Sequence, residues 1–322
     1  PYIRSIFGNN YIESFFESYG IDLVYFTAPS ALAQDLERIN YIITVWDLCH
    51  RDDPEFPEVR NDRMFEHREK LYKSVLTKAV AVLVDSQIGK QNVMRRYGVD
   101  EMRTYILPFS PASGTQVTES EYNAAFIDIK SKYDLNTEYV FYPAQFWAHK
   151  NHVYVLLALK VLEDNHGLRI GAVFSGSDAG GNLDYIKNTA AELGLLERIR
   201  FVGFVKNEEI PYLYRQSIAL VMPTYFGPTN LPPLEAFSLG VPVLYPDKHG
   251  LREQVGDAAL LMDLHEPTSL ADHLATLISD EKSRNSVIKK GELYIESLTT
   301  DDDLITLVSI IKDFRIRRMC WS

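Results

Sequence analysis

The residues best placed for chemistry lie in one polar loop that follows an apolar run. Residues 218–222 are apolar, and the segment 223–240 after them is rich in glycine and proline. Thr229 or Asn230 can cap a helix that starts with two adjacent prolines. A helix start binds anions, because its first N–H groups lack partners and carry the positive end of the helix dipole. The pattern predicts an anion site with Glu235 one helical turn behind it, although Glu235 could also be an ordinary acidic residue of a first turn.

A regular alternation of strands and helices surrounds this loop and must position it. In the second half of the chain, short apolar runs alternate with helical patterns, which indicates a parallel, doubly wound α/β sheet. The expected strands are 139–142, 170–174, 199–202, 218–222, 241–245 and 258–262, and the expected helices are 153–164, 183–194, 210–215, 232–239 and 269–279. Ligands bind at the carboxyl ends of the strands in such sheets, so the loop after 218–222 is well placed.

The first half of the chain shows a shorter version of the same pattern. The expected strands are 21–26, 41–46, 79–84 and 103–107, with helices around 7–19, 60–78 and 88–97. Ser86 is a suitable N-cap for the helix over 88–97, and Gly98 a suitable end. Pro, Ser, Gly, Thr and Glu dominate 108–122, as in a linker. We therefore expect one domain over 1–112, a second over 113–300 and a last helix within 301–322.

Composition and charge disfavour some classes of function. The chain has 322 residues, a net charge of −11 and a pI of about 5.3. Nucleic acid is a poor partner for such a chain, because phosphate backbones are bound by clustered Lys and Arg. Cys49 and Cys320 fit neither a disulfide framework nor a zinc site, so a reducing, cytoplasmic location is expected. No apolar run reaches the roughly 18 residues of a transmembrane helix.

Several motifs together resemble one enzyme family. They are Trp46-Asp47-Leu48-Cys49-His50, the segment 142–151 (YPAQFWAHKN), 174–176 (FSG), 201–205 (FVGFV) and the loop 223–240. These motifs span most of residues 41–280. In their residues and their order, they resemble the motifs of the retaining GT-B-fold glycosyltransferases of glycosyltransferase group 1 (family 4-like). The resemblance implies two Rossmann-like doubly wound domains. It also implies transfer of a hexose from a nucleoside-diphosphate sugar to a glycan or lipid-linked saccharide acceptor. No metal and no cofactor are implied, since the nucleotide sugar is a substrate.

The same resemblance implies roles for individual residues. Lys150 would clamp the donor diphosphate, where a fixed cation stabilises the negative charge of the leaving group. Glu235 would bind the ribose diol. With glycine at position 227, Asn230 and Thr229, or the backbone amides of the loop from Gly227 to Leu231, would have to hold the sugar hydroxyls. The base would lie against Phe204 and Val205, and Gly203 could let the backbone approach the nucleotide. Asp47 and His50 could contact the acceptor or the sugar. A solvated helix-start lysine and a solvated loop are the plain alternatives for Lys150 and His50.

Three positions depart from the family pattern, and the first domain is short. Gln145, Gly227 and Trp46 stand where the family usually has Arg, Glu and His. The basic residues considered as substitutes for that arginine are His149, Lys248 and Arg252. We expect an incomplete first domain, from a truncated chain or a natural fragment, with a sheet of about four strands.

These departures leave other functions open. One alternative is a non-catalytic nucleotide-sugar-binding or scaffolding subunit of a polysaccharide assembly complex. A weaker one is a sugar-nucleotide epimerase on the same two-domain plan. A lipid-linked acceptor would also be compatible with peripheral association at the inner face of the membrane.

Overall fold

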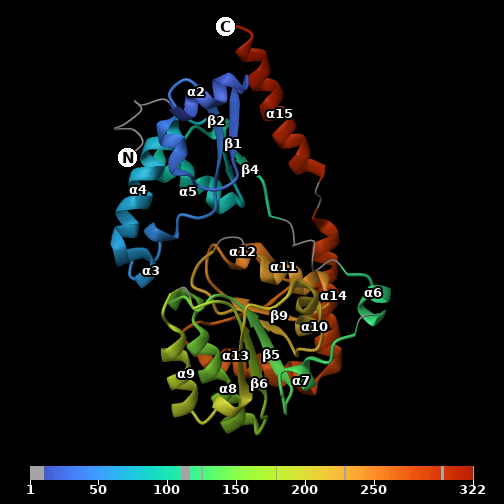
Figure 1. Cartoon of the computed structure of the whole chain (residues 1–322). Helices are drawn as coiled ribbons and strands as arrows, with labels where there is room; N and C mark the ends of the chain where they lie inside the picture. The colour runs from blue at the N-terminus through green and yellow to red at the C-terminus, as the bar shows by residue number, and fades with distance from the viewer. Residues whose placement is uncertain are drawn as a thin grey trace. The chain divides into compact units, whose positions relative to one another are not determined.

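The chain forms two compact units (Figure 1). The computed structural model describes residues 11–109, 117–124, 126–178, 180–227, 230–298 and 301–321. The first unit takes its described residues from 1–55, 59–109 and 299–322. The second takes them from 110–298 together with Phe56–Glu58, a short segment that no sequence pattern assigns to this unit.

A four-stranded parallel sheet is the centre of the first unit. Its strands, in spatial order, are β1 (Leu23–Phe26), β2 (Asn40–Val45), β3 (Ala81–Val84) and β4 (Thr104–Ile106). The two central strands are almost wholly buried, as their continuous apolar runs predict. All strands run parallel, so their carboxyl ends, and the loops that follow them, lie at one edge of the sheet.

Helices cover both faces of this sheet (Figure 1). One face carries α2 (Tyr11–Ser18), α4 (Met64–Val75) and α5 (Gln87–Tyr97), whose apolar residues share a core cluster with the sheet. The other face carries α15 (Asp301–Arg318), where Ile310 packs with Ile42 and Leu83. α3 (Pro57–Arg60) is a single helical turn between β2 and α4.

The ends of α4 and α5 show how local signals set a helix. Ser86 accepts a hydrogen bond from the Gly89 N–H at 3.0 Å, and Gly98 ends α5 with a φ of 66°, both as predicted. The helix predicted over 60–78 is shorter in the structure. Asp62 and Arg63 adopt φ values of 53° and 59°, which an α-helix cannot include, so α4 begins only after them.

A six-stranded parallel sheet is the centre of the second unit. Its strands are β5 (Tyr139–Pro143), β6 (Gly171–Ser175), β7 (Ile199–Gly203), β8 (Leu220–Val221), β9 (Val243–Pro246) and β10 (Leu260–Met262). Their spatial order is β10-β9-β8-β5-β6-β7. The chain therefore runs from the centre to one edge and then from the centre to the other, and its direction reverses between β5 and β8. The predicted fold class, two Rossmann-like parallel α/β units, is confirmed.

Helices also cover both faces of the second sheet (Figure 1). The described α-helices of the second unit are α6 (Glu119–Ala124), α7 (Ile129–Lys132), α8 (His152–His166), α9 (Leu183–Glu192), α10 (Ile210–Arg215), α11 (Leu231–Ser238), α12 (Arg252–Val255), α13 (Pro267–Ser279) and α14 (Glu281–Ser297), and α6 lies to one side of the sheet. α8 packs on α13, and α11 packs on α14. α14 is not among the helices predicted from the sequence, although Asp280 caps it by accepting bonds from the N–H groups of Lys282 and Ser283. Within the described ranges, no helix is long and apolar enough to cross a membrane.

Candidate functional site

Two loops meet where the strand order of the second sheet reverses. The short 3-10 turn Ala148–Lys150 follows β5, and the segment 223–230 follows β8. β5 and β8 are neighbours, paired in parallel through Phe141 and Leu220. Loops after such a pair of strands diverge and leave a ligand-binding crevice at the carboxyl ends of the strands. The topology thus places the predicted Lys150 and the predicted anion loop at one location.

Both the side-chain ammonium group and the backbone carbonyl of Lys150 are hydrogen-bonded. Its ammonium group donates to Asn230 Oδ1 at 3.2 Å, and its backbone carbonyl accepts from the Tyr142 hydroxyl at 2.9 Å. Asn230 is buried and occupies the N-cap position of α11. The structure therefore joins the cation from one loop to the helix start of the other.

The Asn230 side chain does not cap α11, contrary to one prediction from the sequence. Its amide group instead donates to the Gly227 carbonyl and to the Tyr245 hydroxyl, each at 2.6 Å. These bonds aim the amide oxygen of Asn230 at Lys150. Thr229, the other cap candidate, lies outside the described residues.

Gln254 of α12 fixes the backbone of Asn230. It accepts from the Asn230 N–H at 3.0 Å and donates to the Asn230 carbonyl at 2.6 Å. Tyr245 also donates to Gln254 Oε1, at 2.9 Å. Tyr245 and Gln254 are not among the predicted site residues, because their role depends on packing that no local pattern encodes.

Gly227 has a conformation that side-chain-bearing residues rarely adopt. Its φ is 110°, and a Cβ atom there would lie 2.7 Å from Asn230 Oδ1. A side chain at this position would therefore add backbone strain and displace the residue that contacts Lys150. The glycine that departs from the family pattern has a physical reason to be glycine.

Glu235 lies one turn inside α11, as predicted. Its Oε2 atom accepts a hydrogen bond from the Tyr214 hydroxyl at 2.8 Å. Burial raises the pKa of Glu235 above its usual value, while the bond from Tyr214 acts in the opposite direction. A carboxylate has about four lone-pair sites, so the Tyr214 bond leaves it able to accept from a diol. Leu231, the first residue of α11, is partly buried.

The residues predicted to contact a base lie at the end of β7. Gly203 has a φ of 67°, and its carbonyl accepts from the Gly176 N–H at 2.8 Å. Phe204 is 93% exposed, whereas Val205 packs against the core. The structure leaves this stretch accessible next to the strand ends, and the contact with a base stays a prediction.

The remaining basic candidates of the second unit are engaged in local contacts. Lys248 donates to the backbone carbonyl of Tyr225 at 2.7 Å, so its ammonium group lies against the loop after β8. Arg252 pairs with Asp247 at 2.9 Å, and both side chains are exposed. Lys248 therefore contacts the loop after β8, whereas Arg252 pairs with an acidic residue near it in the sequence.

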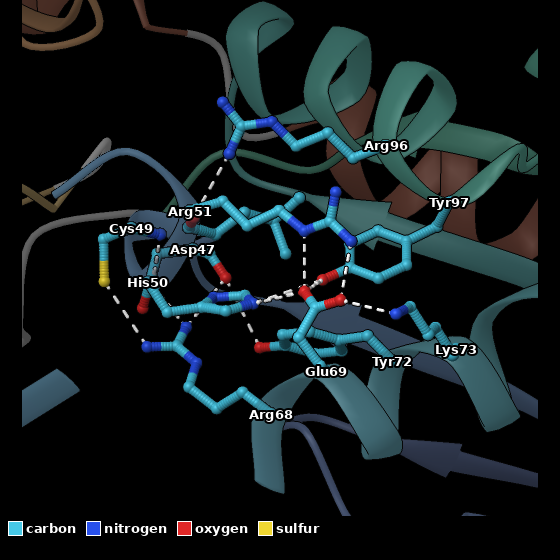
Figure 2. Close-up of polar contacts among 11 residues, drawn as sticks. Asp47, Cys49, His50, Arg51, Arg68, Glu69, Tyr72, Lys73, Arg96 and Tyr97 are labelled. Carbon is cyan, nitrogen blue, oxygen red and sulfur yellow. Dashed lines mark hydrogen bonds and ion pairs between the residues drawn. The ribbon is translucent and has the colours of Figure 1, made fainter. Parts of the chain in front are cut away.

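A cluster of charged side chains surrounds the two first-unit candidates, Asp47 and His50 (Figure 2). Both follow β2 at the carboxyl end of its sheet. Asp47 forms an ion pair with Arg68 of α4, which also donates to the Asp47 backbone carbonyl at 3.0 Å. Burial disfavours the charged form of Asp47, but Arg68 and bonds from Cys49 hold its pKa below the usual value. Asp47 is thus an ionised partner of α4, with a side chain 26% exposed.

His50 is fully buried, and we assign it a structural role instead of the predicted contact with a substrate. Its Nε2 atom lies 3.0 Å from Glu69 Oε1 and 3.2 Å from the Tyr97 hydroxyl. Burial, together with the nearby Arg68, holds the pKa of His50 below its usual value, so the ring is neutral near pH 7. A ring without exposed surface cannot contact a substrate in this structure.

Glu69 is the centre of the same cluster (Figure 2). Both of its oxygens accept from Arg51, from Nε and Nη2 at 2.6 Å each. Tyr97 and Lys73 add bonds at 2.7 and 3.0 Å. Because Arg51 and these further donors bind the charged form, the pKa of Glu69 lies far below its usual value, although burial opposes this.

Comparison with known proteins decides the family. Residues 124–294, just over half of the chain, match the sequence profile of the family described as Glycosyl transferases group 1. The chain belongs to this family. The resemblance inferred from the motifs is thereby confirmed.

Related sequences extend the similarity beyond the matched segment. The chain is 28% identical over 274 residues to O-antigen chain mannosyltransferase B of Escherichia coli, covering 84% of this chain and 69% of that protein. It is also 28% identical over 283 residues to D-inositol 3-phosphate glycosyltransferase of Corynebacterium glutamicum (strain R), covering 84% of this chain and 65% of that protein. The chain thus spans about two thirds of the length of these curated relatives.

Solved structures share the fold of this group 1 family member. The structure of Anabaena Alr3699/HepE in complex with UDP-glucose superposes with a TM-score of 0.75 at 18% identity, over 96% of this chain and 84% of that one. Sucrose-phosphate synthase from Thermosynechococcus elongatus gives 0.73 at 18% identity, over 95% and 77%. These structures have the GT-B fold, and so does this chain.

The charged cluster around Glu69 should stabilise the folded state of this group 1 family member. Replacing Glu69 with alanine leaves Arg51 and the buried His50 without their carboxylate, and we expect a loss of roughly 3–5 kcal/mol in the free energy of unfolding. The pKa of Glu69 is lowered in the folded state, so its contribution is present above about pH 4.5 and is lost as the pH falls. Urea unfolding of Glu69→Gln between pH 7 and pH 3 should therefore show a shallower acid-side loss of stability than the wild type. Glu66→Gln, on the exposed side of α4, is the control; equal pH slopes for all three proteins would contradict the assignment.

Proposed function

We propose that this chain transfers a hexose from a nucleoside-diphosphate sugar to a glycan or lipid-linked saccharide acceptor, with retention and without a metal. The observation that carries the proposal is the bond between the Lys150 ammonium and Asn230 at the start of α11, where the strand order reverses. A positive charge and a helix N-terminus at one point suit a diphosphate.

The chemistry follows from charge that develops on the leaving group. The acceptor hydroxyl oxygen bonds to the anomeric carbon as the bond from that carbon to the diphosphate oxygen breaks. The electron pair stays on the diphosphate, where Lys150 stabilises it, and the hydroxyl proton passes to a departing phosphate oxygen. This route needs no protein base, so the burial of His50 is compatible with it.

Glu235 holds the other end of the donor in this proposal. Tyr214 orients its carboxylate, which accepts from the ribose hydroxyls. The described part of the chain contains no group of three or more His, Cys, Asp or Glu that could hold a metal ion. A known neighbour of the same fold was solved with UDP-glucose, and the curated relatives are named as sugar transferases, which supports a nucleotide-sugar donor here.

A second candidate is a non-catalytic nucleotide-sugar-binding or scaffolding subunit. A Cβ atom at Gly227 would lie 2.7 Å from Asn230 Oδ1, and the exposed Gln145 accepts a bond from the Trp147 indole N–H at 2.8 Å. Two groups that the family pattern would bring to the donor are thus absent from these positions. Such a site could bind a nucleotide sugar and turn it over poorly.

The deciding experiment is a donor panel with the intact chain. UDP-, GDP- and dTDP-sugars are tested for binding by calorimetry, and for hydrolysis and transfer by release of the nucleotide, with lipid-linked and soluble saccharides as acceptors. We expect binding and turnover with one donor class. Binding without hydrolysis or transfer would support the second candidate, and absence of any binding would overturn both.

Glu235→Ala tests the ribose contact separately. Loss of a charge-assisted hydrogen bond should weaken nucleotide binding by about 1–3 kcal/mol, measured by calorimetry. Glu192→Ala, an exposed acid of α9, is the matched control. An unchanged nucleotide affinity in Glu235→Ala would remove the ribose assignment while leaving Lys150 untested by this variant.

A further inference from the structure

In the turn that carries Lys150, the backbone N–H of His149 is bonded from outside the turn. In the turn Ala148–Lys150, the N–H groups of Lys150 and Asn151 bond within the turn, at 3.1 and 3.0 Å. Trp147, at the N-cap position, offers no side-chain acceptor. The N–H of His149 is therefore one of the orphan donors of a helix start, which normally need a capping oxygen.

Glu58 supplies this acceptor from 91 residues away in the sequence. Its Oε1 atom accepts from the His149 backbone N–H at 2.9 Å and also contacts His149 Nδ1. Glu58 lies in the second unit by contact, with Phe56 and the residue between them. One carboxylate oxygen thus fixes both the backbone and the ring of the residue next to Lys150.

His149 passes this constraint to the loop after β8. Its backbone carbonyl accepts from the Tyr225 N–H at 2.9 Å. Its ring stacks on Phe226, with centroids 3.8 Å apart and planes 14° from parallel. The Phe56 ring packs against Tyr225 and Phe226, with centroid distances of 5.2 and 5.6 Å. Residues 56–58 therefore hold together the two loops that supply Lys150 and Asn230.

The contact made by Glu58 is a charged one. Burial of Glu58 opposes ionisation, but the bonds from the His149 ring and backbone hold its pKa below the usual value. Charge-assisted bonds of this kind are about twice as strong as neutral ones. His149 is itself buried, so the pair is shielded from water.

We propose that Glu58 is a positioning residue of the donor site, which caps the His149 turn and so fixes the Lys150 ammonium against Asn230. This inference rests on the proposed function for its catalytic consequence. Glu58 does not touch the donor in this proposal; it acts through His149 and Lys150. Phe56 supports it by covering the stacked rings.

Hydrogen exchange tests the positioning without any donor. In Glu58→Ala, amide exchange at His149 and in the described residues of the loop after β8 should be faster than in the wild type, with exchange in α9 unchanged. Glu58→Gln keeps an acceptor oxygen and should lie between the two. Glu55→Ala, an exposed acid three residues earlier, is the control. Unchanged exchange in Glu58→Ala would overturn the proposal, whatever the protein binds.

Turnover tests the catalytic consequence. Glu58→Ala should lower kcat by about 10- to 100-fold with little change in donor Kd, since a displaced ammonium stabilises the leaving group poorly. In a Lys150→Ala background, the Glu58→Ala change should add almost nothing, because both changes remove the same interaction. Additive losses would overturn the proposal. A wild type that binds no nucleotide, with exchange altered as expected, would instead refute the proposed function and leave Glu58 as a cap of this turn only.

Discussion

Replacing Lys150 with alanine is expected to lower kcat by about 10²–10³-fold, the usual loss when one group that stabilises developing negative charge is removed. The charge on the diphosphate grows as the glycosidic bond breaks, so the ammonium matters more in the transition state than in the bound donor. Donor affinity should fall by only about tenfold or less, because the start of α11 and Glu235 still bind. Nucleotide release gives kcat, and calorimetry with the nucleotide gives Kd.

The Lys150→Ala result needs a control for folding. Asn230 loses one partner in this variant, but its bonds to Gly227, Tyr245 and Gln254 remain. The midpoint of thermal unfolding should therefore change little. Lys282→Ala, an exposed lysine of α14, should match the wild type in every measurement. A fall in stability with unchanged kcat would return Lys150 to the role of an ordinary lysine at a helix start.

Much of the fold could be predicted because its signals are local. The strands of the second unit are apolar runs separated by helices, and this alternation alone indicates a parallel sheet with covered faces. Ser86 and Gly98 mark the ends of α5 by hydrogen bonding and by φ. The incorrect start of the helix predicted over 60–78 also has a local cause. At Asp62 and Arg63 the backbone turns left-handed, and nothing in these residue types requires that.

Some residues of the candidate site could be predicted from local sequence patterns, and others could not. Lys150, Asn230 and Glu235 could be found because the loops after parallel strands and the first turn of a helix have recognisable sequences. Glu58, Tyr245 and Gln254 act through contacts between distant segments, which one sequence does not reveal.

His50 shows the same limit in the opposite sense. The residues after it in the sequence are polar, and this pattern favours a position near the surface. In the structure His50 is buried and contacts Glu69 of α4 and Tyr97 of α5. Only the packing of those helices on the sheet decides whether this histidine meets solvent or protein.

Replacing Gly227 with glutamate, the residue that the family pattern suggests, should impair the protein and not improve it. The backbone φ of 110° costs about 1–3 kcal/mol for a residue with a side chain. The new Cβ atom would lie 2.7 Å from Asn230 Oδ1, so Asn230 must move and release Lys150. We expect kcat to fall by about tenfold or more. The midpoint of thermal unfolding should also fall, because of the backbone strain.

Two variants separate strain from displacement of Asn230. Gly250→Ala places a Cβ at a φ of 94° with no atom within 4 Å, so it reports backbone strain alone. Gly227→Ala adds the collision with Asn230 without adding a charge. If both Gly227 variants lose turnover and Gly250→Ala loses only stability, the contact between Lys150 and Asn230 is the element that the glycine protects. Higher turnover in Gly227→Glu would show that a carboxylate can be accommodated and that Asn230 is dispensable, because the two groups compete for the same space beside Lys150.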